Sequence, residues 1–136
     1  MTDLPPVELP PVFSPALEAE LWSKARRKAL AMHSMGELQS GLQDNDWRVR
    51  LVVVEHLIVR GGDDPRALPE LLEAARDDSA WQVRCAALVG LSQFEPKSVL
   101  PTLHGAATDP LPDVRQAAGY SLNQLGENGE SDRKAE

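Results

Sequence analysis

Apolar residues recur at helical spacing through most of the chain, in segments separated by short runs of turn-forming residues. The first segment begins at Ser14 and Pro15, a pair typical of a helix N-cap followed by proline at the first helical position. Its apolar residues fall on one arc, which predicts a capping helix at 14–33 with a single buried face. The residues of this arc are Leu17, Leu21, Trp22, Ala25, Ala29 and Met32.

Three pairs of shorter helices are predicted after this first helix. Ser34 and Glu37 have the spacing of a capping box, which predicts a short helix from about 35 to 43. A turn at 44–46 leads into the next helix, which two successive glycines end. The same plan returns twice, so the predicted hairpins cover about 34–62, 63–94 and 95–126. The residues predicted to face inward from the second helices are Val49, Val52, Val53, His56, Leu57, Val83, Ala86, Ala87, Leu91, Phe94, Val114, Ala117, Ala118, Leu122 and Leu125.

The two ends of the chain depart from this helical pattern. Residues 1–13 contain four prolines and few helix formers, which predicts a disordered, extended arm. The arm also carries large apolar side chains, so the alternative is that it packs along the helices. Residues 127–136 are rich in charge and have no apolar anchor, and a disordered tail is predicted there. The apolar side chains of the arm include Leu4, Val7, Leu9 and Phe13.

A seven-residue frame returns at the start of the second helix in each predicted pair. It reads D-N-D-W-R-V-R at 44–50, D-S-A-W-Q-V-R at 78–84 and D-P-L-P-D-V-R at 109–115, at intervals of 34 and 31 residues. Self-similarity at this period is typical of helical solenoids, in which one hairpin cannot bury its own apolar face. We therefore predict that residues 14–126 form an all-α fold, a short α-solenoid of three helical hairpins preceded by a capping helix.

Two more sequence features accompany the frame. L-P-E-L at 68–71 matches L-P-T-L at 100–103, and A-A-x-x-x-L occurs at both 86–91 and 117–122. With these features the chain resembles the HEAT-like repeat family, in particular its short phycobilisome-lyase-type repeats. The resemblance implies a structural ladder in which the Asp and Arg of the frame join neighbouring repeats. Those residues are Asp44, Arg50, Asp78, Arg84, Asp109 and Arg115.

Charge and composition argue against nucleic acids and membranes as partners of this chain. The net charge is −7 and the middle repeat is acidic, so the basic groove that nucleic-acid binding requires is not predicted. The one basic cluster, at 24–28, is interpreted as the solvated side of the first helix. A single cysteine, Cys85, excludes an internal disulfide. Since no leader segment or long apolar run is present, we predict a cytoplasmic protein without a membrane partner.

The chain lacks the sequence signatures of catalytic and metal-binding members of this fold. HEAT-repeat deoxyhypusine hydroxylases hold iron with His-Glu dipeptides, whereas this chain has only Glu55-His56, in the reverse order. His56 is therefore interpreted as an interior histidine, and His33 and His104 lie on different hairpins. No Gly-rich phosphate loop and no nucleophile motif occurs. We predict no metal, no cofactor and no enzyme activity.

One surface of the predicted solenoid is a candidate binding site. Residues two and six positions after the inward-facing valine of each frame point away from the core, at 100° per residue. Among them, Leu51, Cys85, Val89 and Tyr120 form an apolar stripe on the second helices, which the resemblance places on a concave face. Trp47 and Trp81 are predicted to border it, as aromatic anchors do at binding hot spots. The alternative is that the tryptophans wedge between repeats and the arm covers the stripe. The predicted partner-binding residues are Trp47, Leu51, Glu55, Trp81, Cys85, Val89, Gln116 and Tyr120.

The sequence therefore favours a non-catalytic adaptor or assembly factor that presents a concave groove to a protein partner. The alternative, which rests on the resemblance to bilin lyases of the phycobilisome type, is an accessory lyase or chaperone-like protein. Such a protein handles a cofactor or pigment on its target protein.

Overall fold

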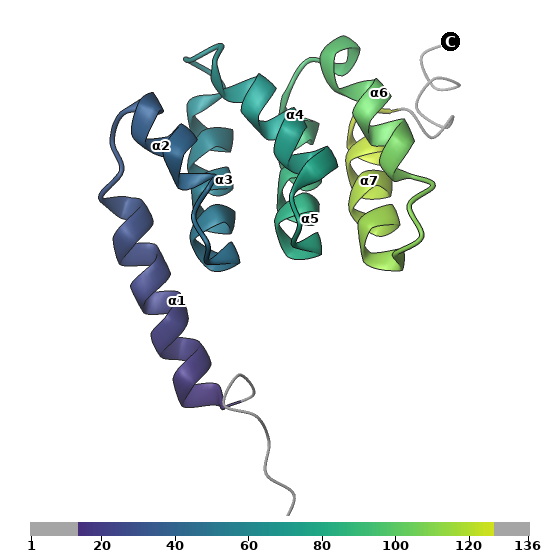
Figure 1. Ribbon diagram of the computed structural model, residues 1–136. Coiled ribbons are helices and arrows are strands. Elements are labelled where there is room, and N and C mark those ends of the chain that lie inside the picture. The colour runs from purple at the N-terminus through teal and green to yellow at the C-terminus, as the bar shows by residue number, and fades with distance from the viewer. Residues whose placement is uncertain (1–13, 127–136) are drawn as a thin grey trace, which may run out of the picture.

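A computed structural model describes residues 14–126, which form seven α-helices and one short 3-10 helix. The predicted all-α solenoid of a capping helix and three hairpins is confirmed (Figure 1). The predictions for 1–13 and 127–136 lie outside the described residues. The helices are α1 (Pro15–Leu30), α2 (Met35–Gly41), α3 (Trp47–Arg60), α4 (Ala67–Asp77), α5 (Trp81–Gly90), η2 (Leu91–Gln93), α6 (Pro96–Ala106) and α7 (Pro112–Gln124).

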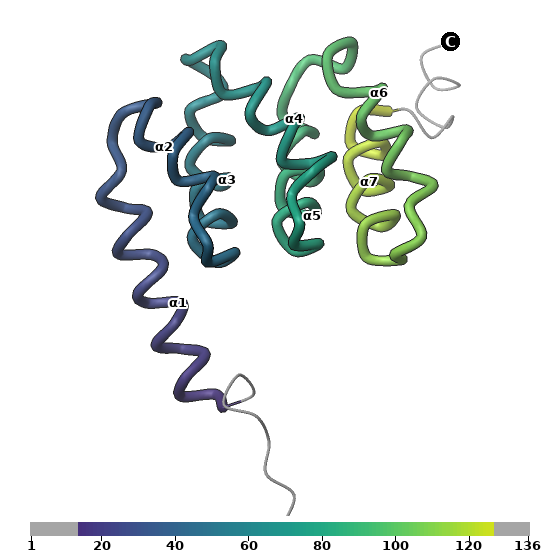
Figure 2. The backbone as a smooth tube through the Cα atoms, viewed as in Figure 1, coloured from purple at the N-terminus to yellow at the C-terminus, as the bar shows by residue number. Residues whose placement is uncertain are grey.

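The hairpins stand in a row, and α1 closes one end of it. In Figures 1 and 2, α2/α3, α4/α5 and α6/α7 follow one another across the molecule. The second helices form one layer, in which α3 packs directly on α5 and α5 on α7. The first helices form the other layer, where α4 and α6 contact each other less extensively. The helix α1 packs on α3, so it takes the place of a preceding repeat.

The starts of α1 and α2 follow directly from local sequence. The Ser14 hydroxyl accepts a hydrogen bond from the Leu17 N–H at 3.4 Å, and Pro15 occupies the first helical position. At α2, the Glu37 N–H donates to the Ser34 hydroxyl at 3.1 Å while the Ser34 N–H donates to the Glu37 carboxylate at 3.0 Å. These backbone bonds hold the pKa of Glu37 below its ordinary value. The capping box predicted from the spacing is therefore present.

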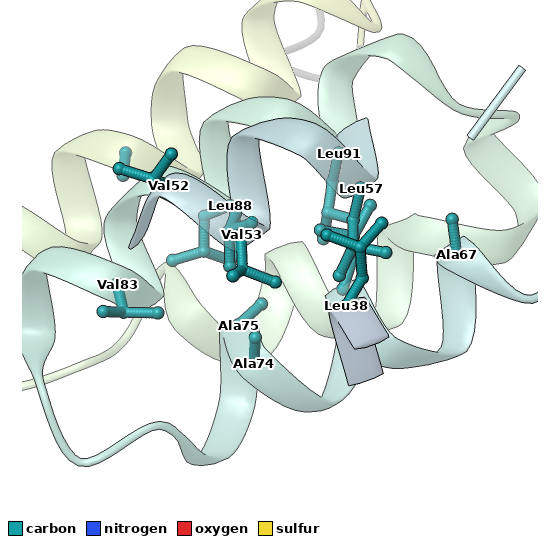
Figure 3. Close-up of a cluster of buried hydrophobic side chains, with 14 of the residues drawn as sticks. Leu38, Val52, Val53, Leu57, Ala67, Ala74, Ala75, Val83, Leu88 and Leu91 are labelled. Carbon is teal, nitrogen blue, oxygen red and sulfur yellow. The ribbon is translucent and has the colours of Figure 1, made fainter. Parts of the chain in front are cut away.

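One continuous apolar core runs through the stack. Val53, Leu57, Val83 and Leu88 are wholly buried between the two layers (Figure 3). Small residues of α4 face them, which lets the helices approach closely. Each large side chain buried in this way stabilises the fold by about 1.5–3 kcal/mol. The small residues are Ala67, Ala74 and Ala75.

The seams between the second helices are closely fitted. The backbone of Gly90 lies against the Ile58 side chain, and a Cβ at Gly90 would stand 2.1 Å from the Ile58 Cδ1. The buried Ser121 hydroxyl donates to the Leu88 carbonyl at 2.6 Å. His56 occupies the corresponding position of α3, but it is half-buried rather than interior as predicted. Its neighbour on that side is the lone helix α1 instead of a complete hairpin.

The second hairpin also differs from the prediction at its end. The helix α5 stops at Gly90 and continues as η2, so Phe94 lies beyond the helix rather than on its inward face. Phe94 is half-buried against Gly61, where an added Cβ would stand 2.2 Å from the ring. The packing of this ring replaces a final helical turn. Ala86 and Leu125, also predicted to face inward, are half-buried.

Gly90→Ala is expected to destabilise the protein by about 1–3 kcal/mol, because the methyl group overpacks the seam against Ile58. Adding Ile58→Val to this variant removes the clashing Cδ1 and should recover part of the loss. Gly119→Ala is the matched control, since a methyl group there meets open space in a helix. It should stabilise by about 0.5–1 kcal/mol. Urea unfolding followed by circular dichroism measures all three, and equal effects at Gly90 and Gly119 would contradict the seam.

Candidate functional site

The Asp and Arg of each frame first stabilise their own turn. In every copy the carboxylate of the Asp accepts the N–H of the residue two positions later, at 2.8–2.9 Å. In every copy the Arg six residues on donates to the backbone carbonyl of that same Asp, at 2.7–2.8 Å. The pair therefore fixes where each second helix begins. The pairs are Asp44 with Arg50, Asp78 with Arg84 and Asp109 with Arg115.

Within residues 14–126, a frame Arg reaches the frame Asp of a neighbouring repeat only once. Arg50 donates to both carboxylate oxygens of Asp78, from Nε at 2.9 Å and from Nη2 at 3.1 Å. The two side chains are 11% and 8% exposed, so this ion pair is largely buried. Within residues 14–126, Arg84 and Arg115 make no hydrogen bond or ion pair with a carboxylate. The ladder implied by the resemblance is thus corrected to one carboxylate rung.

A cleft lies beside this rung, between the turn that precedes α3 and the helix α4. Its volume is about 490 Å³, and five carboxylates line it together with Arg50. Burial by itself raises the pKa of Asp44. The Lys28 ammonium at 2.6 Å and the Asp46 N–H together lower this pKa by more than burial raises it, so its net shift is downward. A smaller cleft of about 190 Å³ lies at the equivalent position of the next repeat, between α4 and α6. The carboxylates of the larger cleft belong to Asp44, Glu70, Glu73, Asp77 and Asp78.

Trp47 belongs to the junction between α1 and α3. Its ring meets that of Trp22 edge-on, with the centroids 5.5 Å apart and the planes at 90°. The Arg48 guanidinium lies 4.8 Å from the Trp47 centroid and pairs with Glu18 at 2.7 Å. The Arg48 side chain is only 12% exposed. Trp47 is half-buried and helps to attach the capping helix to α3, and its predicted place at the border of a binding groove stays a prediction. The inward position of Trp22 was the one sequence signal for this contact.

The remaining stripe residues lie on the second-helix layer, but their exposure differs. Trp81 and Val89 are each 40% exposed and Tyr120 is 49% exposed. Leu51 and Cys85 are half-buried and pack against the core. Burial and the Asp113 carboxylate raise the pKa of the Cys85 thiol, so this thiol is a weak nucleophile at neutral pH. Glu55 and Gln116 are exposed.

Sequence reasoning missed one further member of this surface. Val59 is 81% exposed on α3, four residues after Glu55. Steps of four residues return to nearly the same side of a helix, so extending the spacing rule by one turn identifies it. We call the set formed by Leu51, Glu55, Val59, Trp81, Cys85, Val89, Gln116 and Tyr120 the second-helix face.

Neither a metal centre nor a membrane span is found in the part of the chain that the structure describes. Among residues 14–126, no three His, Cys, Asp or Glu side chains are grouped so that they could hold a metal ion. Over the same residues, no helix combines the length and the apolar character needed to cross a bilayer.

Arg50→Ala is expected to destabilise the protein by about 2–4 kcal/mol, because it leaves the buried Asp78 carboxylate without its cation. Arg84→Ala should cost about 1 kcal/mol, since Arg84 donates only to a backbone carbonyl. Arg115→Ala, at an exposed position, should change stability by no more than about 0.5 kcal/mol. Chemical denaturation at pH 7 gives this order, and a larger effect at Arg84 than at Arg50 would refute the single rung.

Comparison with known proteins gives one family. A family model described as HEAT repeats matches residues 20–91 and again residues 68–134, and together these matches span most of the chain. A search of curated proteins found no match. The repeat frame, the paired helices and the two overlapping matches agree with one another. The chain therefore belongs to the HEAT-repeat family.

Proposed function

We propose that this protein is a binding adaptor whose second-helix face receives a protein partner. The observation that carries the proposal is the exposure of Trp81, Val89 and Tyr120 on α5 and α7. HEAT repeats are commonly scaffolds for protein interaction. Leaving large apolar side chains in water gains nothing for folding, so a surface that gathers them is better explained by a partner.

The packing of the layers supports a concave shape for this face. The second helices α3, α5 and α7 pack directly on one another, whereas α4 and α6 are less closely packed and a cleft opens between them. In a row of hairpins, the layer with the closer helices lies on the inside of the curve. Solenoids of this kind use their inner surface for binding.

The chemistry of the exposed side chains also favours a protein ligand. Tryptophan and tyrosine combine large apolar area with a polar group, and both are enriched at binding hot spots. Trp81 and Val89 stand two helical turns apart on α5, with the half-buried Cys85 between them. Tyr120 on α7 has the same position in its frame as Val89. The two helices thus offer exposed apolar side chains at matching positions, and Glu55 adds an exposed carboxylate on α3.

Val89→Asp is expected to abolish capture of a protein partner from native lysate while the helical circular-dichroism signal persists. A hot-spot change of this kind weakens binding by about 2 kcal/mol or more. At an exposed position it should alter folding stability by only about 0.5 kcal/mol. Mass spectrometry identifies the proteins that Val89→Asp captures, and they are compared with those that the unsubstituted chain captures.

Leu30→Asp is the matched control, because Leu30 is a 60% exposed apolar residue on α1, away from the second-helix face. This variant should fold and retain the partner. The proposal fails if Val89→Asp folds and still captures the same protein, or if Val89→Asp unfolds the chain and so proves Val89 to be a core residue.

A further inference from the structure

We propose that the segment 1–13 of this same chain docks along the second-helix face over α5 and α7, where it competes with the external partner. The regulatory consequence rests on the proposed function, whereas the docking itself does not. Three features support this docking: where the described chain begins, how far 13 residues reach, and which of the two outer segments carries apolar side chains.

The described chain begins beyond the starts of the second helices, at the same end of the molecule (Figure 1). Glu18 near the start of α1 pairs with Arg48 at the start of α3, and Arg60 at the end of α3 donates to the His33 carbonyl beyond the end of α1. The helices α1 and α3 therefore run parallel. Ser14 lies four residues before Glu18, about 6 Å further along the axis at 1.5 Å per residue. Trp81 is the first residue of α5, so it lies at this same end of the layer.

The segment is long enough to reach the exposed side chains. Packed helices lie about 8–10 Å apart, and α3 is the helix between α1 and α5. From Trp81 to Val89 the distance along α5 is about 12 Å. A path from Ser14 past Trp81 to Val89 therefore measures roughly 30–35 Å. Thirteen residues in the polyproline II conformation span about 40 Å.

The composition of the segment fits this surface. L-P-P-V occurs twice, at 4–7 and at 9–12, so leucine, valine and prolines recur along its length. Proline-rich segments lose little conformational entropy on binding, and they dock on surfaces that present aromatic rings. Trp81 and Tyr120 supply such rings. Val89 lies next to α7, the helix of Tyr120, and adds an exposed apolar side chain. The other outer segment, 127–136, has one alanine as its only apolar side chain and cannot cover this face.

The sole cysteine of the chain reports whether the face is covered. Cys85 lies one helical turn from both Trp81 and Val89 and is half-buried, so a segment lying across these residues shields its thiol. The experiment measures the rate at which a small maleimide labels Cys85 in the full-length protein at fixed pH. The test variant is Leu4→Ser combined with Leu9→Ser, which removes the leucine from both L-P-P-V copies. The control is Leu30→Ser on α1.

The double variant should be labelled at least fivefold faster than the unsubstituted chain, at an unchanged melting temperature, while Leu30→Ser keeps the original rate. A synthetic peptide of residues 1–13 added to the double variant should slow labelling again. Equal labelling rates for the double variant and the unsubstituted chain overturn the proposal. Protection that rises with protein concentration and persists in the double variant also overturns it, and identifies a second copy as the occupant.

The two proposals fail separately. Suppose that Val89→Asp loses the partner and that the double variant is labelled at the same rate as the unsubstituted chain. The adaptor function then stands, and the docking of segment 1–13 is refuted. Faster labelling of the double variant supports docking of the segment whether or not a partner is captured. If both proposals hold, the double variant should also retain several-fold more partner than the unsubstituted chain at equal protein concentration.

Discussion

The structure depends on the burial of each second helix against its neighbour. A single helical hairpin has too little interior to hide its apolar side chains, so the stack becomes stable only when hairpins share their cores. The seams show how this sharing is achieved. Gly90 lets Ile58 approach the backbone of α5, and the Ser121 hydroxyl on α7 donates to the Leu88 carbonyl of α5. Any change in the angle between hairpins would disturb these contacts together.

The frame at the start of each second helix serves this packing. Its Asp and Arg bind their own turn in every copy, so the three helices begin with the same geometry. The buried pair of Arg50 and Asp78 then adds a link between the first two hairpins. At the next seam Arg84 and Asp109 border a small cleft, and the packing of α5 on α7 joins the hairpins together with the hydrogen bonds of Ser121 and Arg76. One end of the row is closed by α1, where Arg48 lies between Glu18 and the two tryptophan rings.

The same geometry leaves one surface open. On α3 and α5 the fifth residue after the frame valine, Val54 or Leu88, is buried, whereas its counterpart on α7 is the exposed Gly119. The outer helix therefore presents little apolar area toward the end of the row. Apolar exposure is concentrated instead on the second-helix face, at Trp81, Val89 and Tyr120. A binding surface that crosses two helices gains its precision from the seams beneath it, because they fix the spacing of those side chains.

The sequence alone determined the features that local contacts create. The capping box at Ser34 and Glu37, the turns at the three Asp residues and the helical hairpins follow from hydrogen bonds and periodicities that span a few residues. The repeat interval then predicts the solenoid, since stacked hairpins are the arrangement that buries every apolar arc. The spacing rule also identified Val89 and Tyr120 as outward-facing, because direction around a helix is fixed by residue number.

Only the tertiary structure decided how far each side chain is covered and which neighbour it meets. Arg50 reaches a carboxylate of the next repeat and Arg84 does not, although both have the same local frame, because that contact depends on the placement of one hairpin against another. Trp47 and Trp81 hold the same frame position, yet only Trp47 has Trp22 of α1 for a neighbour. His56 is half-buried for the same reason, since its helix faces α1. Local periodicity fixes the direction of a side chain, whereas its partner is set by rotations between elements that no short stretch of sequence encodes.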